Sequence, residues 1–104
     1  RILDLMLERG LLPADALSLK GVLSLRAGEV KDAIDQFSRA ILIDPKDCRL
    51  YNNRGRAYEQ AGDFIRAAQD YSAALSIKPD YGVALLNQAR LAEHMSVAGR
   101  VISK

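Results

Sequence analysis

The sequence has one cysteine, one histidine and no tryptophan in 104 residues. The single cysteine, Cys48, excludes a disulfide within the chain and is typical of proteins from a reducing compartment, so we expect a cytoplasmic location. A metal centre needs three or four converging ligands, and no spacing of His, Cys, Asp or Glu in this sequence supplies them, so we expect no metal site. No apolar run approaches the roughly 20 residues of a membrane-spanning helix, and we expect no membrane partner.

The sequence also has no large excess of positive or negative charge. Fifteen Lys and Arg stand against thirteen Asp and Glu, which gives a net charge of +2. A nucleic-acid surface clusters many more cations, so we expect no nucleic-acid partner. No glycine-rich phosphate loop is present, and His94 and Cys48 have no third group to form a nucleophilic site. The sequence therefore predicts a non-enzyme without a cofactor, with His94 at a groove edge or on the surface and Cys48 partly buried.

What the sequence does have is an internal repeat of 34 residues. Residues 14–47 align with residues 48–81 without a gap. The eight identical pairs are Gly21 and Gly55, Ala27 and Ala61, Gly28 and Gly62, Ala33 and Ala67, Ser38 and Ser72, Ala40 and Ala74, Ile43 and Ile77, and Pro45 and Pro79. A third copy begins at Gly82. We therefore expect one repeat domain, with the end of a preceding repeat at 1–13, full repeats at 14–47 and 48–81, and a partial third repeat at 82–104.

Each repeat is predicted to contain two helices. Gly28 and Gly62 are placed to end the first helix, and Pro45 and Pro79 follow the second, because proline disfavours helix at the residue before it. We expect small residues where the two helices touch, and large ones, Leu85 among them, in the space between layers. The predicted helices span residues 14–27, 30–43, 48–61, 64–77 and 82–95. Residues 1–9 resemble the second helix of an earlier repeat, and residues 97–104 the start of one more helix, cut short.

The repeated residues resemble the tetratricopeptide repeat. The family pattern of bulky residue, Leu-Gly, aromatic, Ala, aromatic, Ala and Pro is matched in the second repeat by Tyr51, Arg54-Gly55, Tyr58, Ala67, Tyr71, Ala74 and Pro79. The resemblance implies an all-α fold, a right-handed α-solenoid of antiparallel helix pairs. Such a superhelix holds a partner's peptide or helix in a concave groove lined by the first helix of each repeat.

By position, the resemblance puts fifteen residues in this groove: Asp15, Ser18, Val22, Leu25, Arg26, Arg49, Asn52, Arg56, Glu59, Gln60, Val83, Leu86, Arg90, Glu93 and His94. The candidates for partner binding are Asn52, Arg56, Arg90, Arg49, Val22 and Leu86. We expect Asn52, Arg56 and Arg90 to hydrogen-bond the main chain or acidic side chains of a partner, since arginine can bind a carboxylate through two donors.

One subtype of the family clamps the terminal carboxylate of a heat-shock protein with two Lys, two Asn and one Arg. Those five positions are here Ser18, Val22, Asn53, Val83 and Asn87, and only Asn53 is of the right type. The sequence therefore predicts no carboxylate clamp in this chain.

The ends of the chain are apolar. Leu3, Leu5, Met6 and Leu7 follow closely on Arg1, and the chain opens without a Met, so we interpret it as a piece of a longer protein. Exposed apolar ends predict self-association, with helix exchange between copies as one route. The leading function is a non-catalytic protein–protein interaction scaffold. The alternatives are a regulatory or substrate-selecting repeat arm of a larger enzyme and a homo-oligomerisation module.

Overall fold

A computed structural model describes residues 13–102 of the chain, with side chains up to Val97. Within this part it contains helices only, five of them, and no strand. They are α2 (Pro13–Arg26), α3 (Val30–Ile43), α4 (Cys48–Gln60), α5 (Phe64–Ile77) and α6 (Gly82–Ile102). The all-α fold class and the predicted limits of α2 to α5 are confirmed to within one residue. The helix predicted at 1–9 lies outside the described residues.

The turn between the two helices of a repeat depends on a glycine with a left-handed backbone. Gly28 has φ +81° and Gly62 has φ +84°. At each site two hydrogen bonds close the turn: Gly28 N–H donates to Leu25 O and Glu29 N–H to Ser24 O, and the same pair recurs one repeat later. This arrangement is a Schellman motif, which ends a helix and satisfies its last carbonyl groups.

The prediction of a new helix at 97–104 is wrong for the described residues. α6 runs without a break from Gly82 to Ile102. The physical reason lies at Ser96, which occupies the position of Gly28 and Gly62. A serine adopts a left-handed conformation only at a cost, so the Schellman turn does not form and the helix continues.

Helices pack closely within each repeat because a glycine faces an aromatic ring. A Cβ atom placed on Gly21 would lie 2.6 Å from the Phe37 ring, and one on Gly55 would lie 2.7 Å from the Tyr71 ring. Both rings have no exposed surface. The repeated alanines Ala33, Ala40, Ala67 and Ala74 are also fully buried. The predicted role of the small residues is therefore confirmed.

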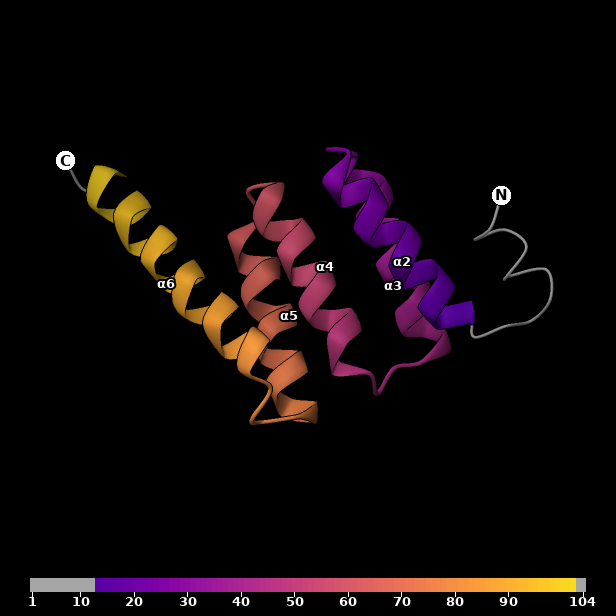
Figure 1. Ribbon diagram of the computed structural model, residues 1–104. Helices are drawn as coiled ribbons and strands as arrows, with labels where there is room; N and C mark the ends of the chain where they lie inside the picture. Colours follow the sequence, from indigo (N-terminus) through magenta and orange to yellow (C-terminus); the bar gives the residue numbers. More distant parts are fainter. Residues whose placement is uncertain (1–12, 103–104) are drawn as a thin grey trace.

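The helix pairs follow one another along the molecule in chain order, with α6 at the far end (Figure 1). Helix α4 contacts both α2 and α6, so the three first helices form one layer, while α3 and α5 form the other. No described helix is long and apolar enough to cross a membrane. This layering places the side chains of α2, α4 and α6 on a common face.

Candidate functional site: the face of α2, α4 and α6

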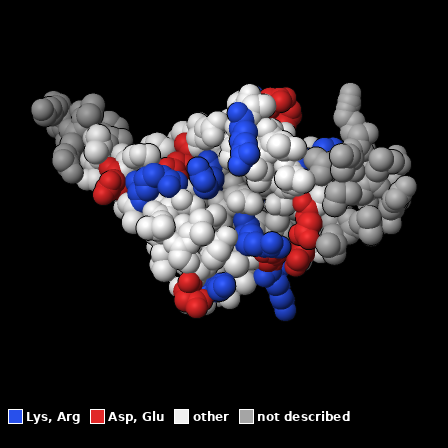
Figure 2. Space-filling view, in the orientation of Figure 1, with Lys and Arg blue, Asp and Glu red and all other residues white. Residues whose placement is uncertain are grey.

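Three adjoining hollows run across the face of α2, α4 and α6. The first hollow, of about 440 Å³, lies over α4 and α6. The second, of about 230 Å³, lies between α2 and α4, and the third, of about 240 Å³, lies near the first residues of α2 and α4. Arg56 and Gln60 line both the first and the second, and Val22 and Asn53 line both the second and the third. We call these joined hollows the groove. In Figure 2, basic and acidic side chains lie scattered over a face that is mostly uncharged.

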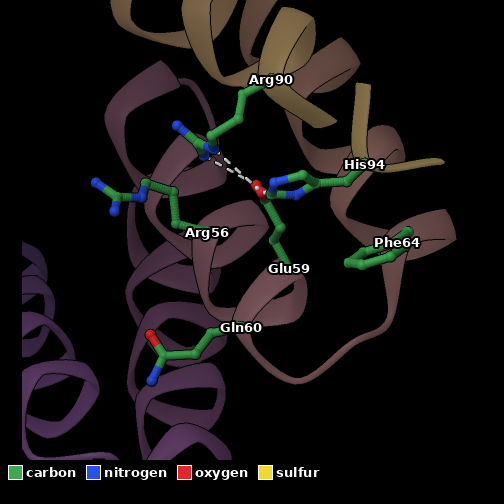
Figure 3. Close-up of a pocket in the computed structure, with 6 residues that line it drawn as sticks. All are labelled: Arg56, Glu59, Gln60, Phe64, Arg90 and His94. Atoms are coloured by element: carbon green, nitrogen blue, oxygen red, sulfur yellow. Dashed lines mark hydrogen bonds and ion pairs between the residues drawn. The ribbon is translucent and has the colours of Figure 1, made fainter. Parts of the chain in front are cut away.

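The carboxylate of Glu59 is the centre of a hydrogen-bond network in the first hollow (Figure 3). Arg90 donates from Nε to Oε2 at 3.1 Å and from Nη2 to Oε1 at 2.9 Å. The hydroxyl of Tyr71 donates to Oε1 at 2.7 Å, and Nδ1 of His94 lies 3.2 Å from Oε2. Glu59 on α4 is therefore tied to α6 through Arg90 and to α5 through Tyr71.

Burial alone would raise the pKa of the Glu59 carboxyl, whose side chain is 9% exposed. The hydrogen bonds from Arg90 and Tyr71 and the positive charge of Arg90 outweigh burial, and the pKa of Glu59 lies below its ordinary value. Burial and the bond to this carboxylate raise the pKa of the Tyr71 hydroxyl. Glu59 is thus ionised at neutral pH, and both of its oxygens are occupied.

Arg56 differs from Arg90 in having no such partner. Its side chain is exposed at the junction of two hollows, and among residues 13–97 it takes part in no hydrogen bond or ion pair. In Figure 3 its guanidinium points away from the Glu59 carboxylate. Arg56 and Arg90 carry two positive charges against one negative charge on Glu59, so the first hollow has a net charge of +1 with His94 neutral. Arg56 carries the cation that the described side chains leave unneutralised there.

Asn52 does not lie where the sequence placed it. It is 2% exposed, and its Oδ1 accepts a hydrogen bond of 2.7 Å from Nδ2 of Asn87, which is itself 4% exposed. Asn87 Oδ1 in turn accepts from Arg90 Nη1 at 2.9 Å. The expectation that Asn52 meets a partner in the groove is therefore corrected, because this amide joins α4 to α6. The spacing of 35 residues between the two asparagines was the signal that could have revealed the contact.

The other predicted groove residues divide into engaged and open ones. Arg49 is bound to Asp47, with Nη2 2.6 Å from Oδ2, and lies 3.5 Å from Asp15 across the repeat boundary. Val22 is half-buried and lines two of the hollows. Leu86 is 73% exposed on α6. Arg56, Val22 and Leu86 thus remain open to a partner, whereas Arg49 already has a carboxylate.

A partly buried ion pair that the sequence did not predict joins α4 to α5. Nε and Nη2 of Arg54 donate to the two carboxylate oxygens of Asp70 at 2.8 and 2.9 Å. Its Nη1 donates to Ser38 of the preceding repeat, and its guanidinium lies 5.8 and 5.9 Å from the ring centres of Tyr51 and Tyr58. Arg54 stands where the repeat pattern has Leu, and this departure was the available signal.

Among residues 13–97, no three His, Cys, Asp or Glu side chains lie close enough together to hold a metal ion. Cys48 is half-buried and free. Of the five clamp positions, Asn53 donates to Ser18 at 3.4 Å and Asn87 is held in the buried network, while Val22 and Val83 carry no polar group. No carboxylate clamp is assembled among these side chains.

Two family models match the chain. The model described as tetratricopeptide repeat matches residues 48–81, and the one described as TPR repeat matches residues 25–62. Together the two matches run from residue 25 to residue 81, more than half of the chain. The chain belongs to the tetratricopeptide repeat (TPR) family. The predicted membership is confirmed.

Among curated TPR proteins, the human tetratricopeptide repeat protein 36 is 35% identical over 67 residues, which are 64% of this chain and 35% of that protein. The match thus spans about a third of the relative. Among solved structures, the Sgt2 TPR domain from Aspergillus fumigatus is similar with a TM-score of 0.77 and 28% identity, covering 80% of this chain and 55% of that one.

The first TPR domain of Spaghetti (RPAP3), solved with an HSP90 peptide, superposes with a TM-score of 0.79 and covers 85% of this chain and 72% of its own. Its identity of 24% makes this a likeness of fold. The agreement with both solved domains supports the solenoid architecture of paired TPR helices described above.

Proposed function

We propose that this TPR chain is a non-catalytic interaction scaffold that holds a segment of a partner protein in the groove of α2, α4 and α6. The observation that carries the proposal is Arg56. A cation that binds no other side chain among residues 13–97, at the junction of two hollows, can donate hydrogen bonds to a partner's carboxylate or main-chain carbonyl. We infer that the scaffold acts in the cytoplasm, as the lone cysteine suggests.

Arg56 and Arg90 have different roles in this proposal. Arg56 contacts the partner directly. Three donors of Arg90 are already used by Glu59 and Asn87, so its remaining N–H groups supply a second, fixed contact point. Val22 and Leu86 offer apolar surface on either side for side chains of the bound segment.

The partner segment differs in chemistry from the HSP90 peptide held by the RPAP3 domain. The positions that clamp a terminal carboxylate carry Ser18, Val22 and Val83 here, and none of them is a cation. We infer that recognition uses internal acidic residues near Arg56 rather than a chain terminus.

The experiment is a peptide array probed with the wild-type chain, Arg56→Glu and Arg39→Glu. Arg39 is exposed on α3, in the other layer, so its replacement is a control with the same change of charge. We expect the wild type to select peptides with acidic residues and Arg56→Glu to bind them at least tenfold more weakly, about 1.4 kcal/mol. Arg39→Glu should bind as the wild type does. Equal loss in both variants, or loss in neither, would remove Arg56 from the proposal.

A further inference from the structure

The second hollow of the groove has an apolar floor inside a polar rim. Val22 and Leu25 of α2 line it and are half-buried, and the ring of Phe37 on α3 also lines it and is fully buried. The rest of the lining is polar, and consists of Arg26, Asn53, Arg56 and Gln60. Such a hollow favours an apolar side chain, because the side chain leaves water while its own backbone stays near polar groups.

The first hollow favours a different kind of side chain. Arg56 and Arg90 with Glu59 give it a net charge of +1, which a single carboxylate would cancel. The two hollows meet at Arg56 and Gln60, which line both. An apolar side chain in the second hollow and a carboxylate on Arg56 would therefore come from nearby positions on the same side of one partner segment.

Two amide side chains at the second hollow favour an extended segment over a helix. Nδ2 of Asn53 lies 3.4 Å from Oγ of Ser18, and Nε2 of Gln60 lies 3.5 Å from the main-chain oxygen of Leu25. Both distances are long for hydrogen bonds, so the amides can turn to a better partner at little cost. An extended segment offers unpaired main-chain N–H and C=O groups to them, whereas a helix has already paired its own.

The spacing of the two partner residues follows from the geometry of an extended chain. Adjacent side chains point to opposite sides, and residues two positions apart lie on one side, about 7 Å from each other. The first hollow lies over α4 and α6 and the second between α2 and α4. Packed helix axes lie about 8–10 Å apart, so the hollows are separated by a similar distance, and the flexible side chain of Arg56 spans the difference. The next spacing on the same side, four residues, is about 13 Å and is too long.

We propose that the partner segment carries an apolar residue two positions from an acidic residue, with the apolar side chain in the second hollow and the carboxylate on Arg56. The proposal rests on the function proposed above, because that function places the carboxylate at Arg56. The spacing is the same for either direction of the segment. An exposed ion pair alone contributes little, so the second hollow is what separates this pattern from other acidic sequences.

The test is a fluorescence anisotropy titration of the whole chain with short synthetic peptides that have one glutamate in a Gly-Ser background. A peptide with Leu two positions before or after the Glu should, in at least one of the two orders, bind about tenfold more tightly than the same peptide with Ala instead of Leu. Moving the Leu to one, three or four positions from the Glu should reduce binding to that of the Ala peptide.

The outcomes separate this proposal from the proposed function. Equal binding of the Leu and Ala peptides, or tightest binding at another spacing, would overturn the pattern, while binding that still needs the Glu would leave the proposed function standing. Binding that does not depend on the Glu at all would remove the proposed function, and the pattern with it.

Variants of Val22 locate the apolar side chain in the second hollow. Val22→Phe fills the hollow, so it should bind the Leu and Ala peptides equally and still need the Glu. Val22→Ala adds no bulk and enlarges the hollow, so a peptide with Phe in place of Leu should gain affinity relative to the Leu peptide. Circular dichroism should show the helix content of the wild type in each variant.

Leu85→Phe is the matched control. Leu85 is 46% exposed on α6, which corrects the expectation that it fills the space between layers, and it lines none of the three hollows. This variant should keep the preference for Leu over Ala. A preference that persists in folded Val22→Phe, does not shift in Val22→Ala, or is lost in Leu85→Phe would each overturn the proposal.

Discussion

Replacing Gly55 by alanine tests whether the contact between α4 and α5 has room for one methyl group. The new Cβ would lie 2.7 Å from Cε1 and 2.9 Å from Cδ1 of Tyr71, and 3.2 Å from Cβ of Asp70. The ring cannot easily retreat, because it is fully buried and its hydroxyl is bound to Glu59 at 2.7 Å. Asp70 is held by the two hydrogen bonds from Arg54. The helices must therefore separate or the ring must leave its network.

The expected magnitude follows from two opposing effects. Forcing an extra carbon into a packed core costs about 1–3 kcal/mol. Alanine favours a helix interior over glycine by roughly 0.5–1 kcal/mol, which offsets part of that cost. The overlap with Tyr71 at 2.7 and 2.9 Å places the cost in the upper part of that range, about 2–3 kcal/mol, so we expect a net loss of about 1–2.5 kcal/mol in the free energy of unfolding.

Urea unfolding followed by the helical circular dichroism signal measures this loss. Gly82→Ala is the matched control, because a Cβ there meets no atom within 4 Å, and its midpoint should not fall. The steric reasoning would be refuted if Gly55→Ala unfolded at the same urea concentration as the wild type or at a higher one.

Two further changes test the networks behind the groove. Arg54→Leu restores the residue type of the repeat pattern, but it leaves the Asp70 carboxylate, which is 7% exposed, without its cation. Urea unfolding should therefore show a loss of about 2–3 kcal/mol in the free energy of unfolding. Adding Asp70→Ala should recover part of it, and a stable single variant would contradict this. Folding also lowers the pKa of Glu59. The ionised carboxylate therefore contributes fully to the free energy of unfolding above its ordinary pKa of 4.5, and this contribution is lost as the pH falls through the lowered pKa of the folded state. Urea midpoints of the wild type should drop in that acid range, whereas Glu59→Gln should respond less steeply; parallel pH curves would show that Glu59 is not responsible.

The repeat pattern predicted the helices well because their limits depend on local chemistry. Gly28 and Gly62 end helices through their own backbone conformation, and Asp47 caps α4 through a hydrogen bond to Arg49 N–H. Such signals act within a few residues and are visible in the sequence. In the third repeat Ser96 stands where the first two repeats have Gly28 and Gly62. This difference was the signal in the sequence that the Schellman turn is absent there.

The side-chain networks were harder to predict because most of their hydrogen bonds join residues 12 to 35 positions apart. The pattern identified Arg90 and Glu59 as groove residues but not as partners, which requires knowing that α4 and α6 touch. Asn52 was assigned to the groove from its helix position alone, and only the packed structure reveals the Asn87 amide beside it. Arg56 lines two of the hollows, and no side chain among residues 13–97 forms a hydrogen bond or ion pair with it. Its contact with a partner remains a prediction.

Glu59 determines two properties at once: how firmly α6 is held to α4, and the net charge of the first hollow. Its carboxylate holds α6 to α4 and at the same time cancels one of the two positive charges in the first hollow. A substitution there that made the groove more basic, and so improved an acidic partner's affinity, would also loosen the last helix. Changes in specificity are therefore easier at Arg56, which forms no hydrogen bond or ion pair with another described side chain, than at Glu59.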